Sequence, residues 1–235
     1  MKLITGLGNP GSKYRDTRHN VGFRVIAELH QRLGQARPSS KFESEFVQVV
    51  IGEHKVLLQS PLTFMNLSGR AVRGLMDFYK IPASELLVVC DDFNLTLGRL
   101  RFRPGGSAGG QNGLKDIIQQ LGTQEIARLR LGVGLPPEDR DVSSYVLSKF
   151  RPEEHSDVDK AIQRAADGAL VWVEHGVQEC MNRFNADPNK PPKPRKKTQD
   201  ESKAGDKGAE DDSDDLERPQ KPGSQSGGNA PGAPI

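Results

Sequence analysis

Five side chains of this sequence could together carry out a hydrolysis. Four are expected where strands end and loops begin, and the fifth, a histidine, is expected at the entrance to a helix. They are one imidazole, one carboxylate and three amides: His19, Asp92, Asn9, Asn66 and Asn112. An aspartate bonded to one imidazole nitrogen fixes the tautomer, so that the other nitrogen can take a proton from water. Amide NH2 groups can stabilise the oxyanion that forms when this water attacks a carbonyl. The set predicts a hydrolase in which His19 is the base and Asp92 its partner, without a serine or cysteine nucleophile.

Each of the five side chains also has a simpler structural interpretation. Asn9 precedes Pro10 in what could be an ordinary turn, and Asn66 and Asn112 each precede an expected helix, where capping is the usual role. Asp92 could form a turn at the end of its strand, and His19 could simply begin a helix. Spacing along the chain does not show whether the five converge, so both interpretations stay open here.

The glycines of residues 6–11, GLGNPG, fit the G-x-G-x-x-G string of dinucleotide-binding proteins. That function requires the last glycine to open a helix and an acidic residue to follow about 20 residues later. Here Pro10 interrupts the string, the apolar helix face begins only at Val21, and Glu28 falls inside the helix. We therefore interpret the glycines as turn-forming residues rather than as a nucleotide site.

Short strands alternate with helices over the first 184 residues. Strands are expected at 2–7, 46–51, 54–59, 86–91, 98–103 and 129–135, and helices at 20–34, 67–80, 113–121 and 153–184. The second and third strands flank Gly52-Glu53 and form a hairpin, so part of the sheet is antiparallel. The pattern predicts a single α/β domain over residues 1–184, with a twisted mixed sheet covered by helices on both faces.

The composition changes after Phe184. Residues 185–235 contain 8 of the 16 prolines, 6 glycines, 9 basic and 10 acidic residues, and no aromatic residue. Such a segment buries too little apolar surface to offset the entropy lost on ordering. We predict that residues 185–235 form a disordered tail.

Cysteine usage and hydropathy exclude several other classes of protein. Cys90 and Cys180 lie far apart in apolar runs, which predicts buried free thiols. There is no signal-type N-terminus and no run of 18 apolar residues, so we expect a cytoplasmic protein that does not engage a membrane. No paired His and Cys spacing indicates a metal site.

Four arginines alternate with apolar residues in two expected strands, LRFR at 100–103 and RLRL at 128–131. Alternation places Arg101 and Arg103 on one face of the first strand, and Arg128 and Arg130 on one face of the second. Paired guanidiniums beside a glycine-rich loop suit phosphate contacts, although a solvated strand face is an equal alternative. The net charge of +3 over residues 1–184 neither requires nor excludes nucleic acid.

Several longer motifs occur in the order and spacing of one family. They are GLGNPG, Tyr14 with TRHNVGF, PLTFMNLSG, VVCDD, GGSAGGQNGLKDI and RLRLGVG. Over roughly residues 2–184 the sequence resembles the bacterial peptidyl-tRNA hydrolases. The resemblance implies cleavage of the ester that joins a peptide to the terminal ribose of tRNA, which frees the tRNA for reuse, with neither metal nor cofactor.

The resemblance also assigns roles to individual residues. It implies that His19 is the catalytic base, that Asp92 is its partner and that Asn9 completes the catalytic set. Tyr14, Met65, Asn66 and Asn112 are the expected substrate-binding residues. Arg101, Arg103, Arg128 and Arg130 are expected to face phosphates near the end of the tRNA. A monomer suits so bulky a substrate.

One residue departs from the family pattern. The family commonly has a histidine immediately before the asparagine of the glycine-rich loop, and Gln111 stands there in this sequence. Glutamine forms hydrogen bonds but does not titrate, which puts any role of a charged imidazole in doubt. The alternative function is that of a non-catalytic RNA-binding relative with the same fold; the intact set of His19, aspartate and three asparagines favours the enzyme.

Overall fold

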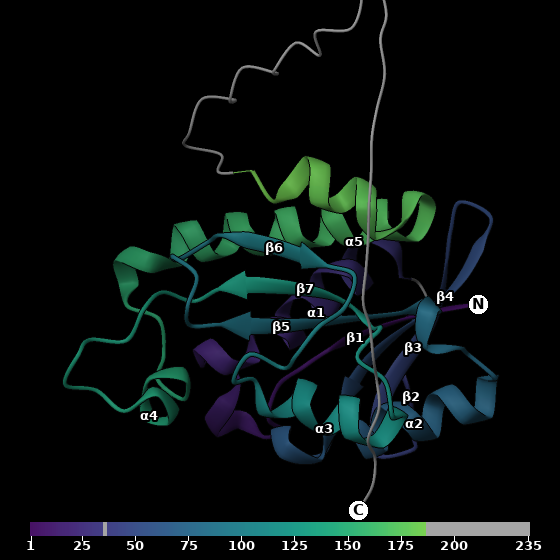
Figure 1. The fold of residues 1–235 in the computed structure, drawn as a ribbon, viewed down its shortest axis with the longest axis horizontal. Helices are drawn as coiled ribbons and strands as arrows, with labels where there is room; N and C mark the ends of the chain where they lie inside the picture. Colours follow the sequence, from purple (N-terminus) through teal and green to yellow (C-terminus); the bar gives the residue numbers. More distant parts are fainter. Residues whose placement is uncertain (35–36, 187–235) are drawn as a thin grey trace, which may run out of the picture. The chain divides into compact units, whose positions relative to one another are not determined.

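The computed structural model describes residues 1–34 and 37–186, and their strands form one mixed sheet (Figure 1). The strands are β1 (Lys2–Gly6), β2 (Ser39–Lys41), β3 (Ser44–Ile51), β4 (His54–Pro61), β5 (Leu86–Asp92), β6 (Leu100–Arg103) and β7 (Ala127–Gly132). Their order is β2-β3-β4-β1-β5-β7-β6. β1 is parallel to β4 and β5, and β5 to β7, whereas β2, β3 and β6 run antiparallel to their neighbours. The predicted hairpin is confirmed as β3 and β4.

Helices cover both faces of the sheet, as predicted. They are α1 (Val21–Leu33), α2 (Ser68–Tyr79), α3 (Asn112–Leu121), α4 (Val142–Val146) and α5 (His155–Phe184). α1 and α5 pack on one face, and α2 and α3 pack on the other (Figure 1). Single 3-10 turns directly precede three of them: η2 (Arg18–Asn20) before α1, η3 (Met65–Leu67) before α2 and η5 (Pro152–Glu154) before α5. β2 and α4 were not predicted, because three and five residues are too short for a periodic pattern.

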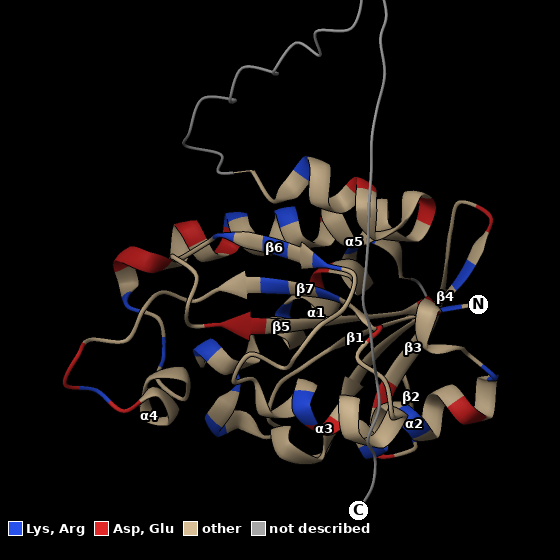
Figure 2. Ribbon diagram, viewed as in Figure 1, with Lys and Arg blue, Asp and Glu red and all other residues tan. Residues whose placement is uncertain are grey.

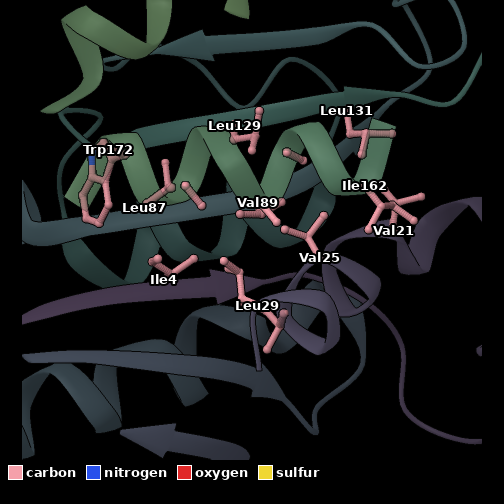
Figure 3. Packing of buried hydrophobic residues seen from close by; sticks show 14 of the residues in the cluster. Ile4, Val21, Val25, Leu29, Leu87, Val89, Leu129, Leu131, Ile162 and Trp172 are labelled. Atoms are coloured by element: carbon pink, nitrogen blue, oxygen red, sulfur yellow. The ribbon is translucent and has the colours of Figure 1, made fainter. Parts of the chain in front are cut away.

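The two faces of β5 belong to two different cores. Leu87 and Val89 join the core beneath α1 and α5, together with residues such as Val25 and Ile162 (Figure 3). Leu86, Val88 and Cys90 join the core beneath α2 and α3. Since side chains alternate along a strand, the next two residues, Asp91 and Asp92, also lie on opposite faces.

The end of α5 is joined to the edge of the sheet by the residue just after the predicted boundary at 184. Asn185, the first residue of the predicted tail, accepts a hydrogen bond at Oδ1 from the backbone N–H of Phe102 (2.7 Å) and donates from Nδ2 to its carbonyl (3.1 Å). The side chain thus pairs with the edge strand β6. The remainder of the predicted disordered tail, from residue 187 on, lies outside the described residues.

Both cysteines are buried and free, as predicted. Burial raises the pKa of the Cys90 and Cys180 thiols to about 12, so neither is a thiolate at neutral pH. Within residues 1–34 and 37–186, no helix combines the length and apolar character needed to cross a membrane.

The start of α1 packs directly on the ends of β1 and β5. A Cβ on Gly22 would lie 2.4 Å from the backbone N and O of Leu7 and 2.6 Å from the carbonyl oxygen of Val89. A Cβ on Gly6 would lie 2.2 Å from the carbonyl oxygen of Gly22. Only glycine allows this approach, which brings η2, and with it His19, to the carboxyl end of β5.

Arg18 anchors η2 from the opposite side. Its buried guanidinium donates to the carbonyl of Val133 (2.7 Å) and to Oε2 of Glu154 (2.6 Å), and it lies 4.6 Å from the ring centres of Tyr145 and Phe150. Burial alone raises the pKa of the Glu154 carboxyl. The hydrogen bonds from Arg18 and from the backbone N–H of Arg151 outweigh it and hold that pKa below its ordinary value of 4.5.

We expect Gly22→Ala and Gly74→Ala to change the free energy of unfolding in opposite directions. The Cβ on Gly22 meets backbone atoms that cannot move aside, and such overpacking typically costs about 1–3 kcal/mol. Gly74 lies in α2, where a Cβ meets only Phe42 at 3.4 Å or more, so alanine gains up to about 1 kcal/mol of helix propensity. Urea denaturation of the two variants measures both effects. Equal and small changes would contradict the close packing of α1.

Glu154→Gln should destabilise the protein by about 3–5 kcal/mol at pH 7, because it leaves the Arg18 guanidinium buried without a counter-charge. Since folding lowers the pKa of Glu154, the pair stabilises the wild type above about pH 4.5 and this contribution is lost as pH falls. The difference in free energy of unfolding between the wild type and Glu154→Gln should therefore become smaller as the pH falls. Asp159→Asn, which breaks the exposed pair with Arg24, is the control and should cost less than about 1 kcal/mol. Melting temperatures of the wild type and both variants, measured from pH 7 to pH 3, test this prediction. A difference between the wild type and Glu154→Gln that stays constant over this range would refute it.

Candidate active site

A cavity of about 640 Å³ lies where the carboxyl ends of the parallel strands meet the following loops. This edge of a parallel sheet is where α/β proteins commonly bind ligands. Six residues predicted for the site line the cavity: Asn9, His19, Met65, Asn66, Asp92 and Asn112. The tertiary structure therefore brings together side chains whose convergence the sequence left open.

The carboxylate that contacts His19 is that of Asp91. The prediction that Asp92 is the partner of His19 is wrong. Nδ1 of His19 lies 2.9 Å from Oδ2 of Asp91, and both side chains are largely shielded from solvent. The reason is the alternation along β5. Asp91 faces the side that α1 and η2 cover, whereas Asp92 faces the side of α2 and α3. The run VVCDD offers two adjacent carboxylates, and only the placement of α1 selects between them.

Asp92 has other partners. Its Oδ1 accepts a hydrogen bond from the backbone N–H of Asn94 (2.9 Å), and its Oδ2 from Nη1 of Arg130 (2.9 Å). The first bond is the local turn that the sequence left open for this residue. Asp92 therefore shapes the loop after β5 and holds an arginine.

Asn9 is fixed by hydrogen bonds to two other loops. Asn20 accepts from the backbone N–H of Asn9 and donates to its carbonyl, each at 2.9 Å. Oδ1 of Asn9 accepts from the backbone N–H of Met65 (2.8 Å). The amide orientation that follows leaves Nδ2 as a donor with no partner among residues 1–34 and 37–186, at the wall of the cavity.

Neither Asn66 nor Asn112 caps a helix, so the structural alternative for these two residues is wrong. Asn66 lies within η3, and the residue before α2 is Leu67. Asn112 is the first residue of α3, and the cap before it is Gln111. Both asparagines are exposed and line the cavity.

Gln111 forms hydrogen bonds in two directions. Its Oε1 accepts from the backbone N–H of Leu114 (2.7 Å), which caps α3. Its Nε2 donates to Oδ1 of Asp91 (3.2 Å) and lies 3.1 Å from the sulfur of Met65. The side chain is 5% exposed, so these contacts are shielded from water.

The cavity also has an apolar wall that sequence reasoning missed, and one predicted residue lies outside it. Phe64, Phe93, Val142, Val146 and Leu147 line the cavity, the last three from α4 and the residue after it. Phe64 is 56% exposed, and no periodic pattern distinguishes such a residue from a core phenylalanine. Tyr14 does not line the cavity; its ring lies beneath the ammonium of Lys13, at 5.5 Å.

The arginines of β6 and β7 form a second cavity, of about 240 Å³, beside the first. The two arginines of each strand lie on one face of that strand, as predicted. Because Arg101 pairs in register with Arg130, and Arg103 with Arg128, all four share one face of the sheet. Figure 2 shows basic segments side by side on these two strands, close to the acidic end of β5. Asp92 and Gly109 line both cavities, which therefore adjoin.

Arg128 is a structural residue, which corrects its prediction as a phosphate contact. It is 1% exposed, and four of its five N–H groups donate to the carbonyls of Ile126, Gly106, Ser107 and Gln124. Burial lowers the pKa of this guanidinium. Arg128 therefore ties the glycine-rich loop to β7.

The other three arginines remain at the second cavity. Arg130 is held by Asp92 and by the carbonyl of Ala108. Arg101 and Arg103 have no ion-pair or hydrogen-bond partner within the described part of the chain. Like charges directly opposite one another destabilise a sheet, so this arrangement favours an anion.

Groups of three or more His, Cys, Asp or Glu side chains arranged to hold a metal ion do not occur in residues 1–34 and 37–186.

The sequence profile of the peptidyl-tRNA hydrolase family matches residues 3–194. Peptidyl-tRNA hydrolase of Rhodopirellula baltica is 50% identical over 186 residues, covering 79% of this chain and 98% of the relative. That of Chlorobium phaeobacteroides is 48% identical over 185 residues, with 79% and 98% covered. The crystal structure of peptidyl-tRNA hydrolase from Acinetobacter baumannii superimposes with a TM-score of 0.74 at 36% identity, covering 79% of this chain and 95% of that one. This chain belongs to the peptidyl-tRNA hydrolase family.

Proposed function

We propose that this protein hydrolyses the ester between peptide and tRNA with His19 as the general base and Asp91 as the partner that orients it. Membership of the family supports the reaction, and the 2.9 Å contact between His19 and Asp91 supports the roles. With Nδ1 directed at the carboxylate, Nε2 is the free nitrogen of an imidazole that lines the cavity.

The reaction then proceeds in two steps. Nε2 of His19 takes a proton from a water molecule as its oxygen attacks the ester carbonyl, and Asp91 stabilises the imidazolium. When the tetrahedral intermediate collapses, the bond to the ribose oxygen breaks and the imidazolium returns the proton to that oxygen. The products are the peptide acid and free tRNA.

The amides and the apolar wall suit the peptide. Nδ2 of Asn9 is a fixed donor, because Asn20 and Met65 hold the rest of that residue, and it can stabilise the oxyanion. Asn66 and Asn112 present further amides at the cavity and can hold peptide groups. The wall formed by α4 and Phe64 can bury apolar side chains of the peptide.

The adjoining arginine cavity suits the tRNA. A phosphate bound by Arg101, Arg103 and Arg130 would neutralise like charges on facing strands, of which only Arg130 has an ion-pair partner among the described residues. Arg128 takes no direct part in this proposal, and Tyr14, outside the cavity, would contact only substrate that extends beyond it.

The same proposal covers the setting of the enzyme. We infer that it acts as a monomer in the cytoplasm, because its substrate is bulky and arises in translation. A non-catalytic RNA-binding relative is not favoured, since the relatives it matches at 48–50% identity are peptidyl-tRNA hydrolases.

His19→Ala should lower kcat on an N-acylated aminoacyl-tRNA by about 10²–10⁴-fold, the usual contribution of a positioned general base. Asp91→Asn should approach the same loss, because an amide favours the wrong imidazole tautomer. Asp92→Asn is the matched control on the neighbouring residue and should lower kcat much less. Steady-state kinetics of the three variants decide the assignment, and a larger loss for Asp92→Asn than for Asp91→Asn would overturn it.

Arg103→Ala should weaken tRNA binding and reduce the slope of log affinity against log salt by about 0.7–1, the effect of losing one phosphate contact. Arg32→Ala, on the exposed side of α1, is the control and should leave the slope unchanged. Fluorescence titration at several salt concentrations measures both slopes. An unchanged slope for Arg103→Ala would remove it from the tRNA surface.

A further inference from the structure

Gln111 links two parts of the site, the end of β5 and the start of α3. It is the residue before α3, and its Nε2 reaches Asp91 at the end of β5. Asn112, which follows it, presents an amide at the cavity. One buried side chain therefore contacts the partner of His19 and sets the helix start that carries Asn112.

The two hydrogen bonds of Gln111 fix the direction of its amide. Because Oε1 accepts from the backbone N–H of Leu114, the NH2 end must face Asp91. A flipped amide would direct a carbonyl oxygen at a carboxylate and an NH2 group at an N–H, losing both bonds. The donor to Asp91 is thus held in place by the cap of α3.

This donor fixes which oxygen of the Asp91 carboxylate faces His19. Oδ1 accepts from Gln111 and Oδ2 contacts Nδ1 of His19, so each oxygen has its own partner. Rotation of the carboxylate away from His19 would break the bond to Gln111 as well. A neutral donor achieves this without adding a charge beside the imidazole.

We propose that Gln111 is a positioning residue of the reaction: it holds Asp91 in the orientation that directs His19, and it does so without titrating. The proposal rests on the proposed function of His19 and Asp91. It implies that residue 111 adds no charge beside the imidazole of His19.

Other charged groups surround the pair and stay constant in the test. Asp92 follows on the same strand and is paired with Arg130 of β7, and Asp141, before α4, lines the same cavity. Arg18, next to His19, is directed away to Glu154. A shift in the pH profile of kcat on substitution of Gln111 is therefore attributed to the change at residue 111.

Two substitutions separate positioning from capping. Gln111→Ser keeps a good helix cap but cannot reach Asp91. Gln111→Glu keeps an oxygen for the N–H of Leu114 but places a carboxylate against Asp91. In metal sites, mutation of a residue that orients a ligand side chain lowers metal affinity or activity by about 10–100-fold. For Gln111→Ser we expect a loss of kcat near the lower end of this range, with KM little changed.

The pH profile provides the readout that capping alone would not change. The added carboxylate of Gln111→Glu favours the protonated imidazole, so the rise of kcat should move to higher pH. Full-length variants are assayed with an N-acylated aminoacyl-tRNA from pH 5 to pH 9, and melting temperatures confirm that both are folded. Wild-type kcat for Gln111→Ser, or a wild-type profile for Gln111→Glu, would reduce Gln111 to a helix cap. Failure of the proposed function would instead be seen as full activity of His19→Ala.

Discussion

The contact between His19 and Asp91 depends on how closely one helix approaches two strands. α1 begins against the ends of β1 and β5, and Gly6 and Gly22 leave no side chain between the backbones. The approach brings η2 to the face of β5 on which Asp91 lies. The buried pair of Arg18 and Glu154 then joins η2 to the turn before α5. The three-residue turn η2 is thus positioned by the glycine contacts with β1 and β5 and by the buried ion pair. The alternation along β5 directs Asp91 at it, so the imidazole is held before any substrate binds.

Amide side chains connect the loops at this edge of the sheet. Asn20 holds the backbone of Asn9, Asn9 holds the backbone of Met65, and Gln111 joins Asp91 to α3. Because an amide has both a donor and an acceptor, each can join two groups and leave its own orientation unambiguous. Such a network keeps the proposed oxyanion donor and the proposed base in fixed relation, which is the condition for electrostatic stabilisation of a transition state.

The four arginines of β6 and β7 differ in burial although they look equivalent in the sequence. Arg128 is enclosed by carbonyls of the glycine-rich loop, and Arg130 is shared between Asp92 and that loop. Arg101 and Arg103 have no partner among residues 1–34 and 37–186. The loop therefore divides one basic face into a structural half and a half that can meet an anion. Asp92, at the boundary of the two cavities, belongs to this arrangement rather than to the imidazole.

Local patterns sufficed for much of the fold and for the choice of His19 as the proposed base. Hydrophobic periodicity predicted α1, α2, α3 and the long helix α5, and alternation placed the arginines of each strand on one face of that strand. The RHN segment and the family motifs singled out His19 and the asparagines. Only the tertiary structure chose Asp91 over Asp92, buried Arg128, placed Tyr14 outside the cavity, and gave Gln111 its second partner. Alternation along β5 places Asp91 and Asp92 on opposite sides of the sheet, but it does not decide which side meets the imidazole. That choice, and the surroundings of Arg128, Tyr14 and Gln111, depend on helices and loops packed there from distant parts of the chain.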